Sequence, residues 1–166
     1  MAEPVTAYLG IGSNLGNRSD NLDRAIDMLS QRMKMGEISS VYDTEPLNPD
    51  QPRYLNIVCE VSTRLTPEGL LTLAKGIESM MGRTGKTGES RPIDIDILLY
   101  DDTVVDTPDL VIPHPRMLER AFVLVPLAEI APDAVHPVLN KGVAGLLEEL
   151  GDVGGVVRYR KERGED

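Results

Sequence analysis

Two aspartates one residue apart, Asp94 and Asp96, are the residues whose type and spacing best suit catalysis. They lie in residues 91–100 (RPIDIDILLY), a short segment that starts with Arg-Pro and is rich in β-branched residues, which predicts a β-strand. Because side chains alternate along a strand, one face carries Ile93, Ile95, Ile97 and Leu99, and the other carries Asp94, Asp96, Leu98 and Tyr100. Since Leu98 and Tyr100 share the aspartates' face, we expect that face to be covered by other parts of the chain.

Carboxylates on a covered surface are costly unless they are paired, hydrogen-bonded or bound to a metal. Two of them about 6.5–7 Å apart on one strand face favour a divalent cation between them. The simpler alternative is a pair of solvated carboxylates at the end of the strand. The Asp-x-Asp spacing alone leaves both interpretations open, so other motifs have to separate them.

The bulk composition indicates a single domain spanning residues 1–166. Hydrophobic residues make up 41% and charged residues 27%, as in a soluble globular protein. The net charge of −10 argues against non-specific binding of nucleic acid, and a polyanionic substrate would need local cations or metal ions. The one cysteine, Cys59, lies in an apolar strand pattern and is expected in the core.

We expect a cytoplasmic protein, because a chain without internal disulfides suits a reducing compartment. The N-terminus lacks a signal-peptide pattern and no apolar run is long enough to span a bilayer, so we expect no membrane partner. We expect a monomer, with a dimer as the alternative.

The order of the predicted elements indicates an α+β fold. Strands are expected at residues 5–11, 37–43, 54–63 and 91–100, with a short hairpin through Val104 and Val105. Helices are expected from a cap at Ser19 or Asp20 to Gly36, from Thr66 through Met80, over 120–127 and over 143–150. The order strand, helix, strand, strand, helix, strand is the split βαβ arrangement, which predicts a mostly antiparallel sheet, helices on one face and a C-terminal helical extension.

Two glycine motifs come close to nucleotide-binding signatures without matching them. Gly85-Lys86-Thr87 resembles the end of a P-loop, but Met80 stands where the first glycine is required, and the segment follows a helix and opens a strand. In residues 10–16 the third glycine of a dinucleotide fingerprint is one position late. We interpret those glycines as a tight turn after the first strand.

The two histidines do not form a convincing zinc site, because they are far apart in sequence and only one cysteine is available. His114, however, is followed by Arg116 and Arg120. A basic cluster near the aspartate strand would suit phosphate groups.

Several motifs together resemble one enzyme family. Residues 91–98 (RPIDIDIL) closely resemble the signature of the 6-hydroxymethyl-7,8-dihydropterin pyrophosphokinases of folate biosynthesis. Collinear matches occur at residues 8–16, 39–46, 54–56, 77–78, 82–83, 113–116 and 119–127. The resemblance implies a ferredoxin-like core and transfer of pyrophosphate from ATP to the hydroxymethyl group of the pterin, with release of AMP.

The resemblance also assigns residues to the site. It implies that Asp94 and Asp96 hold two Mg²⁺ ions, which suits a metal that takes one or two carboxylates plus substrate phosphates. It implies catalytic roles for Arg83, Arg91 and Asp96, and a loop with Lys86 that closes over the triphosphate. The residues implied to bind ATP are Glu78, Lys86, Arg91, His114, Arg116 and Arg120. Those implied to bind the pterin are Thr44, Glu45, Pro46, Leu47, Tyr54, Asn56 and Phe122.

The pterin residues also suit their role on chemical grounds, because a flat ring with polar edges needs apolar faces and hydrogen-bonding groups at its rim. Asn56 offers two donors and an acceptor. Tyr54 and Phe122 could supply the ring faces, and Leu47 could close one side. The alternatives are core packing for Phe122, a strand-edge position for Tyr54 and a loop-anchoring amide for Asn56.

The chain departs from the family at two places. Relatives usually carry an arginine-rich loop ending in Trp-Gly-Pro before the strand arginine, whereas residues 84–90 here are shorter, with one cation and Glu89. We expect such a loop to stabilise ATP phosphates less and to close less firmly. Glu45, where many relatives have proline, is expected to loosen the substrate loop.

Two other functions are kept as alternatives. The first is a non-catalytic small-molecule-binding module on the same fold. The second is a hydrolase that uses Asp94 and Asp96 as an acid/base pair, since carboxyls about 6.5–9.5 Å apart suit an inverting glycosidase. Two acids on one side of one strand, however, do not easily straddle a sugar.

Overall fold

The computed structural model of the protein describes residues 3–46, 48–82 and 92–159. Its main feature is an antiparallel sheet with the strand order β10–β3–β4–β1–β5, in which β2 also pairs with β4. The strands are β1 (Val5–Ser13), β2 (Lys34–Ile38), β3 (Tyr42–Thr44), β4 (Tyr54–Thr63), β5 (Asp94–Tyr100) and β10 (Val156–Arg158). The α+β class and the antiparallel sheet predicted from the sequence are confirmed.

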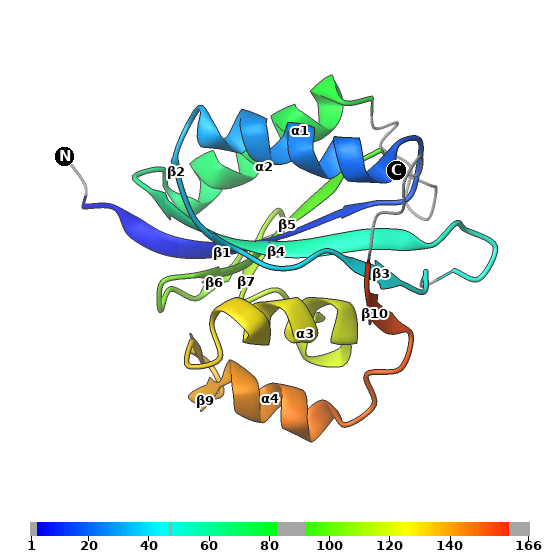
Figure 1. Cartoon of the computed structure of the whole chain (residues 1–166). Coiled ribbons are helices and arrows are strands. Elements are labelled where there is room, and N and C mark those ends of the chain that lie inside the picture. Colours follow the sequence, from blue (N-terminus) through cyan, green and yellow to red (C-terminus); the bar gives the residue numbers. More distant parts are fainter. Residues whose placement is uncertain (1–2, 47, 83–91, 160–166) are drawn as a thin grey trace.

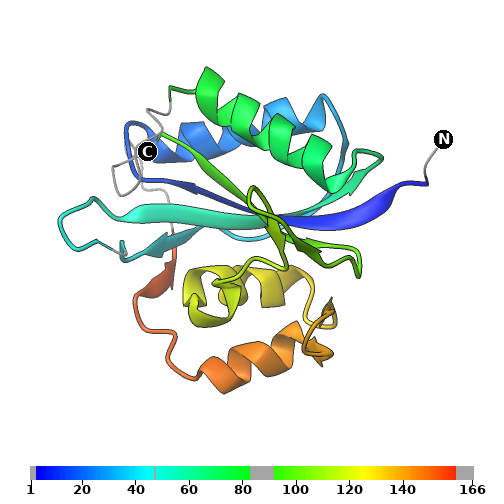
Figure 2. The ribbon, with the colours of Figure 1, turned by 180° about the vertical axis from the view of Figure 1, so that it is seen from behind.

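Helices cover both faces of this sheet (Figures 1 and 2). On one face lie α1 (Arg18–Ser30) and α2 (Pro67–Met80). On the other lies α3 (Ala121–Ile130), with α4 (Val143–Leu150) packed beneath it. The short elements that connect this C-terminal extension are β6 (Val105–Asp106), β7 (Val111–Ile112), the 3-10 helix η1 (Met117–Glu119), β8 (Val135–His136) and β9 (Lys141–Gly142).

The best-predicted elements are those whose signals lie within a few residues. The Thr66 hydroxyl accepts from the Gly69 N–H and Pro67 opens α2, as the start signal predicts. Strand β4 and helix α4 also have the predicted bounds. The start of α1 differs, because its cap is Asn17, whose side chain accepts from the Asp20 N–H.

The predicted end of α1 at Gly36 is wrong, because the helix stops at Ser30 and Gly36 lies inside strand β2. A Cβ at Gly36 would collide with the Glu60 side chain on the neighbouring strand. The glycine therefore serves close packing against β4 rather than a helix end.

The strand predicted over residues 37–43 is two strands, β2 and β3, separated at residues 39–41. Ser39 bonds Val58 of β4 twice, through its N–H and through its hydroxyl. The N–H and hydroxyl of Ser40 turn away to the Glu129 carboxylate of α3. Because the Ser40 N–H bonds a residue outside the sheet, the pairing with β4 is interrupted between β2 and β3.

A β-bulge interrupts the ladder between β1 and β5. Leu9 faces Ile97 and Tyr8 faces Leu99, which leaves Leu98 as the extra residue. Beyond the bulge the faces exchange: Leu99 packs with Leu98, and Tyr100 joins the opposite core, where its hydroxyl donates to Leu65 O at 2.5 Å. The predicted alternation therefore holds through Leu98 and is wrong for Leu99 and Tyr100.

Each face of the sheet has its own core. Against α1 and α2 lies the larger one, which includes Leu9, Ile11, Leu22, Leu29, Ile57, Cys59, Leu70, Ile95 and Ile97. Against α3 and α4 lies the smaller one, with Val58, Leu98, Leu99, Met117, Val123, Leu124, Leu127, Val143 and Leu146. Cys59 is fully buried in the larger core, as predicted.

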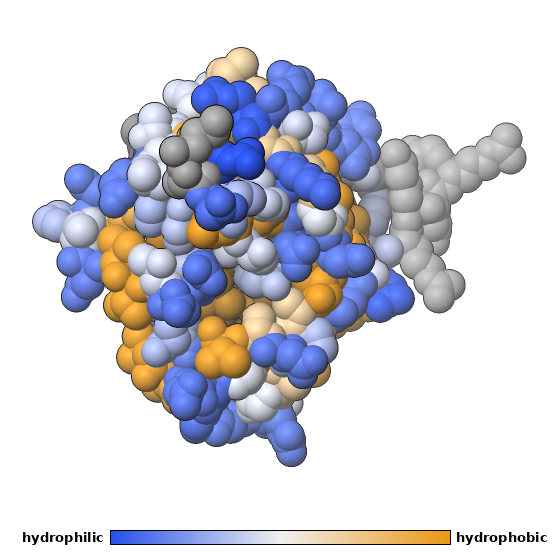
Figure 3. Space-filling model, turned by 90° about the vertical axis from the view of Figure 1, so that its left-hand side faces the viewer, coloured by the Kyte–Doolittle hydropathy of each residue, from blue (hydrophilic) through white to orange (hydrophobic). Residues whose placement is uncertain are grey.

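The outer surface seen in Figure 3 is largely polar, with apolar side chains showing between the polar ones. Within the described part of the chain, no helix is both long and apolar enough to cross a bilayer.

Helix α3 is tied to the sheet through the Glu129 carboxylate. It accepts from the Tyr42 hydroxyl at 2.7 Å, the Ser40 hydroxyl at 2.9 Å and the Ser40 N–H at 3.0 Å. Burial raises the pKa of this carboxyl, but the hydrogen bonds from Tyr42 and Ser40 and the nearby Arg158 outweigh it and bring the pKa below its ordinary value of 4.5.

Glu129→Gln is therefore expected to lower Tm in a pH-dependent way. A carboxyl whose pKa is lower when folded stabilises the fold above its unfolded pKa, and loses that contribution as the pH falls through the folded pKa. We expect a loss of about 2–4 °C at pH 7, since the side chain is solvent-screened, and a smaller difference toward pH 4. Calorimetry measures the Tm at each pH, and Glu148→Gln, which changes an exposed glutamate of α4, is the control variant. A pH-independent difference would contradict the assignment.

Candidate active site

A cavity of about 280 Å³ opens on the α3 face of the sheet. It is bounded by strands β1, β4 and β5, by the loop after β3 and by the start of α3. Its lining residues are Gly10, Gly12, Thr44, Glu45, Pro46, Asn48, Gln51, Tyr54, Asn56, Ile57, Val58, Asp94, Asp96, Arg116, Arg120, Phe122 and Val123. Residues from five separate parts of the sequence thus meet here.

The two aspartates lie on the floor of this cavity. Asp94 pairs with Gly12 and Asp96 with Gly10 in the antiparallel ladder of β5 with β1. Both aspartates are half-buried. Because each faces a residue without a side chain, nothing from β1 reaches over the carboxylates, and the floor remains open to a ligand.

These two glycines are the main feature that the sequence interpretation missed. The sequence predicts a strand that ends at Ile11 and a turn at Gly12, but strand β1 continues through Gly12 to Ser13. A Cβ at Gly12 would lie 2.5 Å from Asn56 Oδ1 and 3.3 Å from Tyr54 Cδ1, so only glycine leaves room for those two side chains. Their spacing of two residues, which puts both on one strand face, was the available signal. Asn48 and Gln51 also line the cavity without having been singled out.

Two arginines bring positive charge to the aspartate side. Arg116 precedes η1 and Arg120 is the N-cap residue of α3, and both line the cavity. The Arg120 guanidinium also lies over the Phe122 ring, 5.4 Å from its centroid. Both arginines of the predicted basic cluster therefore line the same cavity as the aspartates.

His114 lies next to Asp96 but does not line the cavity, with its Nε2 3.9 Å from Asp96 Oδ2. Burial, followed by the nearby Arg120, lowers the pKa of His114 to about 4, although Asp94 acts in the opposite direction. The ring is thus neutral at pH 7, and the contact with Asp96 is not an ion pair. Because Nδ1 accepts from the Arg116 N–H at 3.2 Å, we assign the ring proton to Nε2, toward Asp96.

The opposite side of the cavity combines apolar surfaces with a fixed amide. Tyr54 and Phe122 line it, together with Glu45 and Pro46 of the loop after β3. Asn56 Nδ2 donates to the Thr44 hydroxyl at 2.6 Å, and both residues are at least nine-tenths buried. This hydrogen bond holds the amide in one orientation at the cavity wall.

Glu78 is not among the residues that line the cavity. It lies on α2, on the other side of the sheet, and its buried carboxylate accepts from the Ile95 N–H at 2.7 Å. Ile95 stands between the two aspartates, so Glu78 fixes the strand that carries them. The structure thus gives Glu78 a positioning contact, and its role in binding ATP stays a prediction.

Four predicted site residues, Leu47, Arg83, Lys86 and Arg91, lie outside the described residues. Among the residues that are described, no group of three or more His, Cys, Asp or Glu side chains could hold a metal ion. A pair of carboxylates beside arginines suits Mg²⁺ all the same, because this ion takes its other ligands from water and substrate phosphates.

The buried Asn56–Thr44 bond leads to a stability prediction. Thr44→Val keeps the shape of the side chain but removes the acceptor, so Asn56 Nδ2 is left without its partner. We expect a loss of about 1–3 kcal/mol in the free energy of unfolding. Thr44→Ser keeps the hydroxyl and should lose less, and denaturant unfolding of the two variants measures the difference. Equal losses would show that the hydrogen bond contributes little.

The two floor glycines offer a matched pair. Gly12→Ala should be strongly destabilising, because the new methyl meets an amide that Thr44 holds in place. Gly10→Ala puts its methyl 3.5 Å from Leu98, an ordinary contact, and restricts the unfolded chain. We expect Gly12→Ala to unfold at least about 4 °C below Gly10→Ala in thermal melts. The reverse order would contradict the packing described.

Comparisons with known proteins agree with the motifs. A family model described as 7,8-dihydro-6-hydroxymethylpterin-pyrophosphokinase (HPPK) matches residues 8–132. The 2-amino-4-hydroxy-6-hydroxymethyldihydropteridine pyrophosphokinase of Bacillus subtilis is 43% identical over 128 residues, which cover 75% of this chain and 77% of the relative. The enzyme of the same name from Aquifex aeolicus is 40% identical over 139 residues, covering 82% and 87%.

Longer relatives and a solved structure also match. Folic acid synthesis protein fol1 of Pneumocystis carinii is 41% identical over 148 residues, but these cover 87% of this chain and only 20% of that protein. The crystal structure of Plasmodium falciparum HPPK-DHPS wild type with pteroate superposes with a TM-score of 0.75 at 17% identity, covering 89% of this chain and 44% of that one, which supports the fold alone. From the family model and the bacterial relatives, the chain belongs to the 7,8-dihydro-6-hydroxymethylpterin pyrophosphokinase family.

Proposed function

We propose that this protein transfers pyrophosphate from ATP to the hydroxymethyl group of 6-hydroxymethyl-7,8-dihydropterin, releasing AMP, in folate biosynthesis. Family membership supports the reaction type. The observation that carries the proposal is the cavity itself, where one side offers carboxylates and arginines and the other offers apolar walls with a fixed amide. A charged triphosphate suits the first side and a flat heterocycle suits the second.

On the pterin side, Asn56 and Thr44 recognise the polar rim of the ring, and Tyr54 and Phe122 contact its faces. The rigid Asn56–Thr44 bond orients the amide before the substrate arrives, so little ordering is needed on binding. Glu45 and Pro46 line the cavity from the loop after β3, and Leu47 of the same segment is proposed as a further pterin contact. These roles direct the hydroxymethyl group toward the aspartate floor.

On the phosphate side, Arg116 and Arg120 bind the triphosphate together with Arg83, Lys86 and Arg91. The hydroxymethyl oxygen forms a bond to the β-phosphorus, the bond from that phosphorus to the α,β-bridging oxygen breaks, and AMP leaves with this oxygen. Such a transfer depends mainly on alignment and charge neutralisation. Neutral His114 lies beside Asp96, with its Nε2 3.9 Å from Asp96 Oδ2, and adds no charge to that carboxylate's surroundings.

Asp94 and Asp96 are proposed to hold two Mg²⁺ ions. Mg²⁺ bound there would neutralise phosphate charge and polarise the phosphoryl oxygens. The fit rests on the donor set, because both groups are oxygen ligands on one open strand face and the ladder fixes their spacing.

We further propose a ferredoxin-like split βαβ core, a single domain over residues 1–166, a monomeric state and a cytoplasmic location. The strand order β5–β1–β4–β3 with α1 and α2 on one face supports the ferredoxin-like assignment.

Asp94→Asn and Asp96→Asn test the proposal. Each should lower AMP release at least about a hundredfold, because the charge that holds the metal is lost, while Tm stays close to that of the parent. The assay contains ATP, Mg²⁺ and the reduced hydroxymethylpterin, with nucleotides resolved by chromatography. Asp106→Asn, on the exposed strand β6, is the charge-matched control.

The nucleotide product separates this proposal from its alternatives. ADP in place of AMP would indicate transfer of one phosphate, and pterin binding without turnover would support the binding module. Unchanged rates in either aspartate variant would overturn the metal assignment.

A further inference from the structure

The chain after α4 returns to the sheet beside the substrate loop (Figure 1). We name residues 151–159 the C-terminal strap. Its strand β10 pairs with β3, so that Val156 faces Thr44 and Arg158 faces Tyr42. The Tyr159 N–H donates to Val41 O at 2.8 Å. The strap therefore follows β3 along its whole length.

The strap also contacts a residue of the cavity wall, one residue pair beyond the end of β3. The Glu45 N–H donates to Gly155 O at 3.1 Å, and Glu45 lines the cavity. Gly155 has φ +84°, and a Cβ there would lie 2.9 Å from Glu45 Cδ and 3.1 Å from Oε2. The absence of a side chain at Gly155 thus makes the space in which the Glu45 side chain lies.

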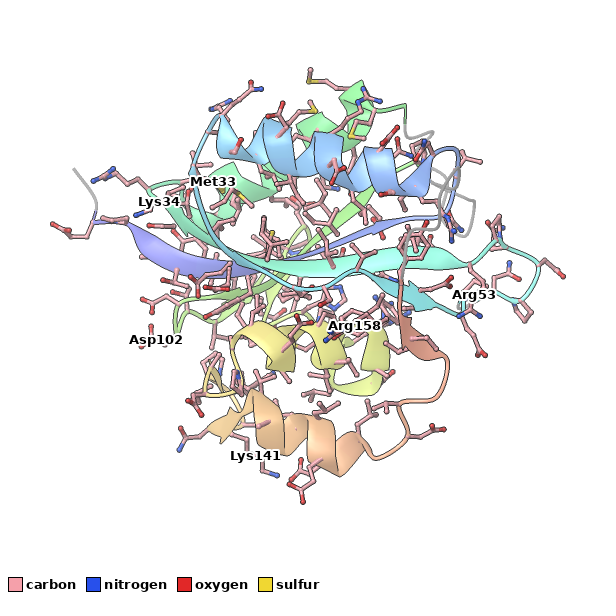
Figure 4. All side chains as sticks on the ribbon, viewed as in Figure 1. Met33, Lys34, Arg53, Asp102, Lys141 and Arg158 are labelled. Atoms are coloured by element: carbon pink, nitrogen blue, oxygen red, sulfur yellow. The ribbon has the colours of Figure 1, made fainter. Side chains whose placement is uncertain are left out.

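The other end of the strap is anchored to α3. Arg158 faces Tyr42 in the β10–β3 ladder, and its guanidinium acts to lower the pKa of both the Tyr42 hydroxyl and the Glu129 carboxyl. The Tyr42 hydroxyl donates to Glu129 of α3. Figure 4 shows Arg158 reaching from β10 toward α3. Because α3 also carries Phe122, which lines the cavity, the strap is connected to the pterin side both through Glu45 and through α3.

A simpler interpretation is that the strap only covers an exposed sheet edge. Edge cover explains the ladder between β10 and β3. It also explains the bond from the Glu45 N–H to Gly155 O, which extends the same register by one residue pair. It does not explain why a glycine with positive φ stands beside the side chain of Glu45, a residue of the cavity wall. A proline at position 45 would have no N–H to donate to Gly155. Through this N–H, Glu45 ties the substrate loop to the strap.

We propose that the C-terminal strap positions the pterin side of the cavity, with Gly155 as the positioning residue that acts through Glu45. The inference rests on the proposed function for the identity of the ligand. It predicts that a disturbance at Gly155 weakens pterin binding and leaves ATP binding and the chemical step nearly unchanged.

The test compares Gly155→Ala with Gly151→Ala. Both glycines have positive φ (+84° and +78°), which L side chains rarely adopt, so alanine strains the backbone at each, but a Cβ at Gly151 meets no described atom within 4 Å. We expect the pterin KM to rise about fivefold or more in Gly155→Ala relative to Gly151→Ala, with kcat and the KM for ATP within about twofold. The Tm values of the two variants should be similar.

A double variant identifies the contact. In a Glu45→Ala background the clash partner is gone, so Gly155→Ala should then affect the pterin KM no more than Gly151→Ala does. If Gly155→Ala alone does not fold, Glu45→Ala/Gly155→Ala should fold as well as Glu45→Ala/Gly151→Ala. Failure of that double variant to fold, or equal pterin KM values for the two single glycine variants, would overturn the proposal.

Calorimetric titration of the same variants with the pterin, in the presence of a non-hydrolysable ATP analogue, separates this inference from the proposed function. If the parent protein releases no AMP, the proposed reaction is wrong. The positioning role of the strap is then tested by the pterin Kd alone, which should be higher in Gly155→Ala than in Gly151→Ala. Equal Kd values would show that the strap serves only as edge cover.

Discussion

The site depends on the pairing of two aspartates with two glycines across the β1–β5 ladder. Half-buried carboxylates of like charge are costly, and this sheet meets that cost by surrounding them with compatible groups. Gly10 and Gly12 leave the floor open, Arg116 and Arg120 supply positive charge, and His114 beside them remains neutral. A side chain on β1 at either glycine would narrow the space above the carboxylates.

Helix α3 joins this floor to the rest of the cavity. Its N-cap residue Arg120 and, two positions on, Phe122 both line the cavity. Its C-terminal Glu129 bonds Ser40 and Tyr42 at the break between β2 and β3. The same helix therefore positions both kinds of binding group and holds the strand from which the substrate loop starts. Movement of α3 would change both sides of the cavity together.

Local signals in the sequence predicted the elements that depend on neighbours in the chain, such as β4 and the Thr66 cap of α2. They failed where a contact with a residue far away in the sequence determines the local secondary structure. Gly36 lies in a strand because Glu60 packs over it, and the predicted strand at 37–43 breaks because Ser40 bonds Glu129, 89 residues away. The motif resemblance named the aspartates and several residues of the loop, β4 and α3 that the structure brings together in one cavity. It gave no sign of the open floor or of the C-terminal strap.

The bulge at Leu98 explains why the polar part of the aspartate strand is so short. Without it, Tyr100 would follow the aspartates on the cavity face. With it, Leu98 and Leu99 both pack into the α3 core, and Tyr100 is turned to the opposite side, where it bonds Leu65. The bulged residue's own carbonyl accepts from the His114 N–H at 3.0 Å. One irregularity thus ends the polar floor with an apolar wall and places His114 beside Asp96, so the site geometry follows from a break in the alternation that first revealed it.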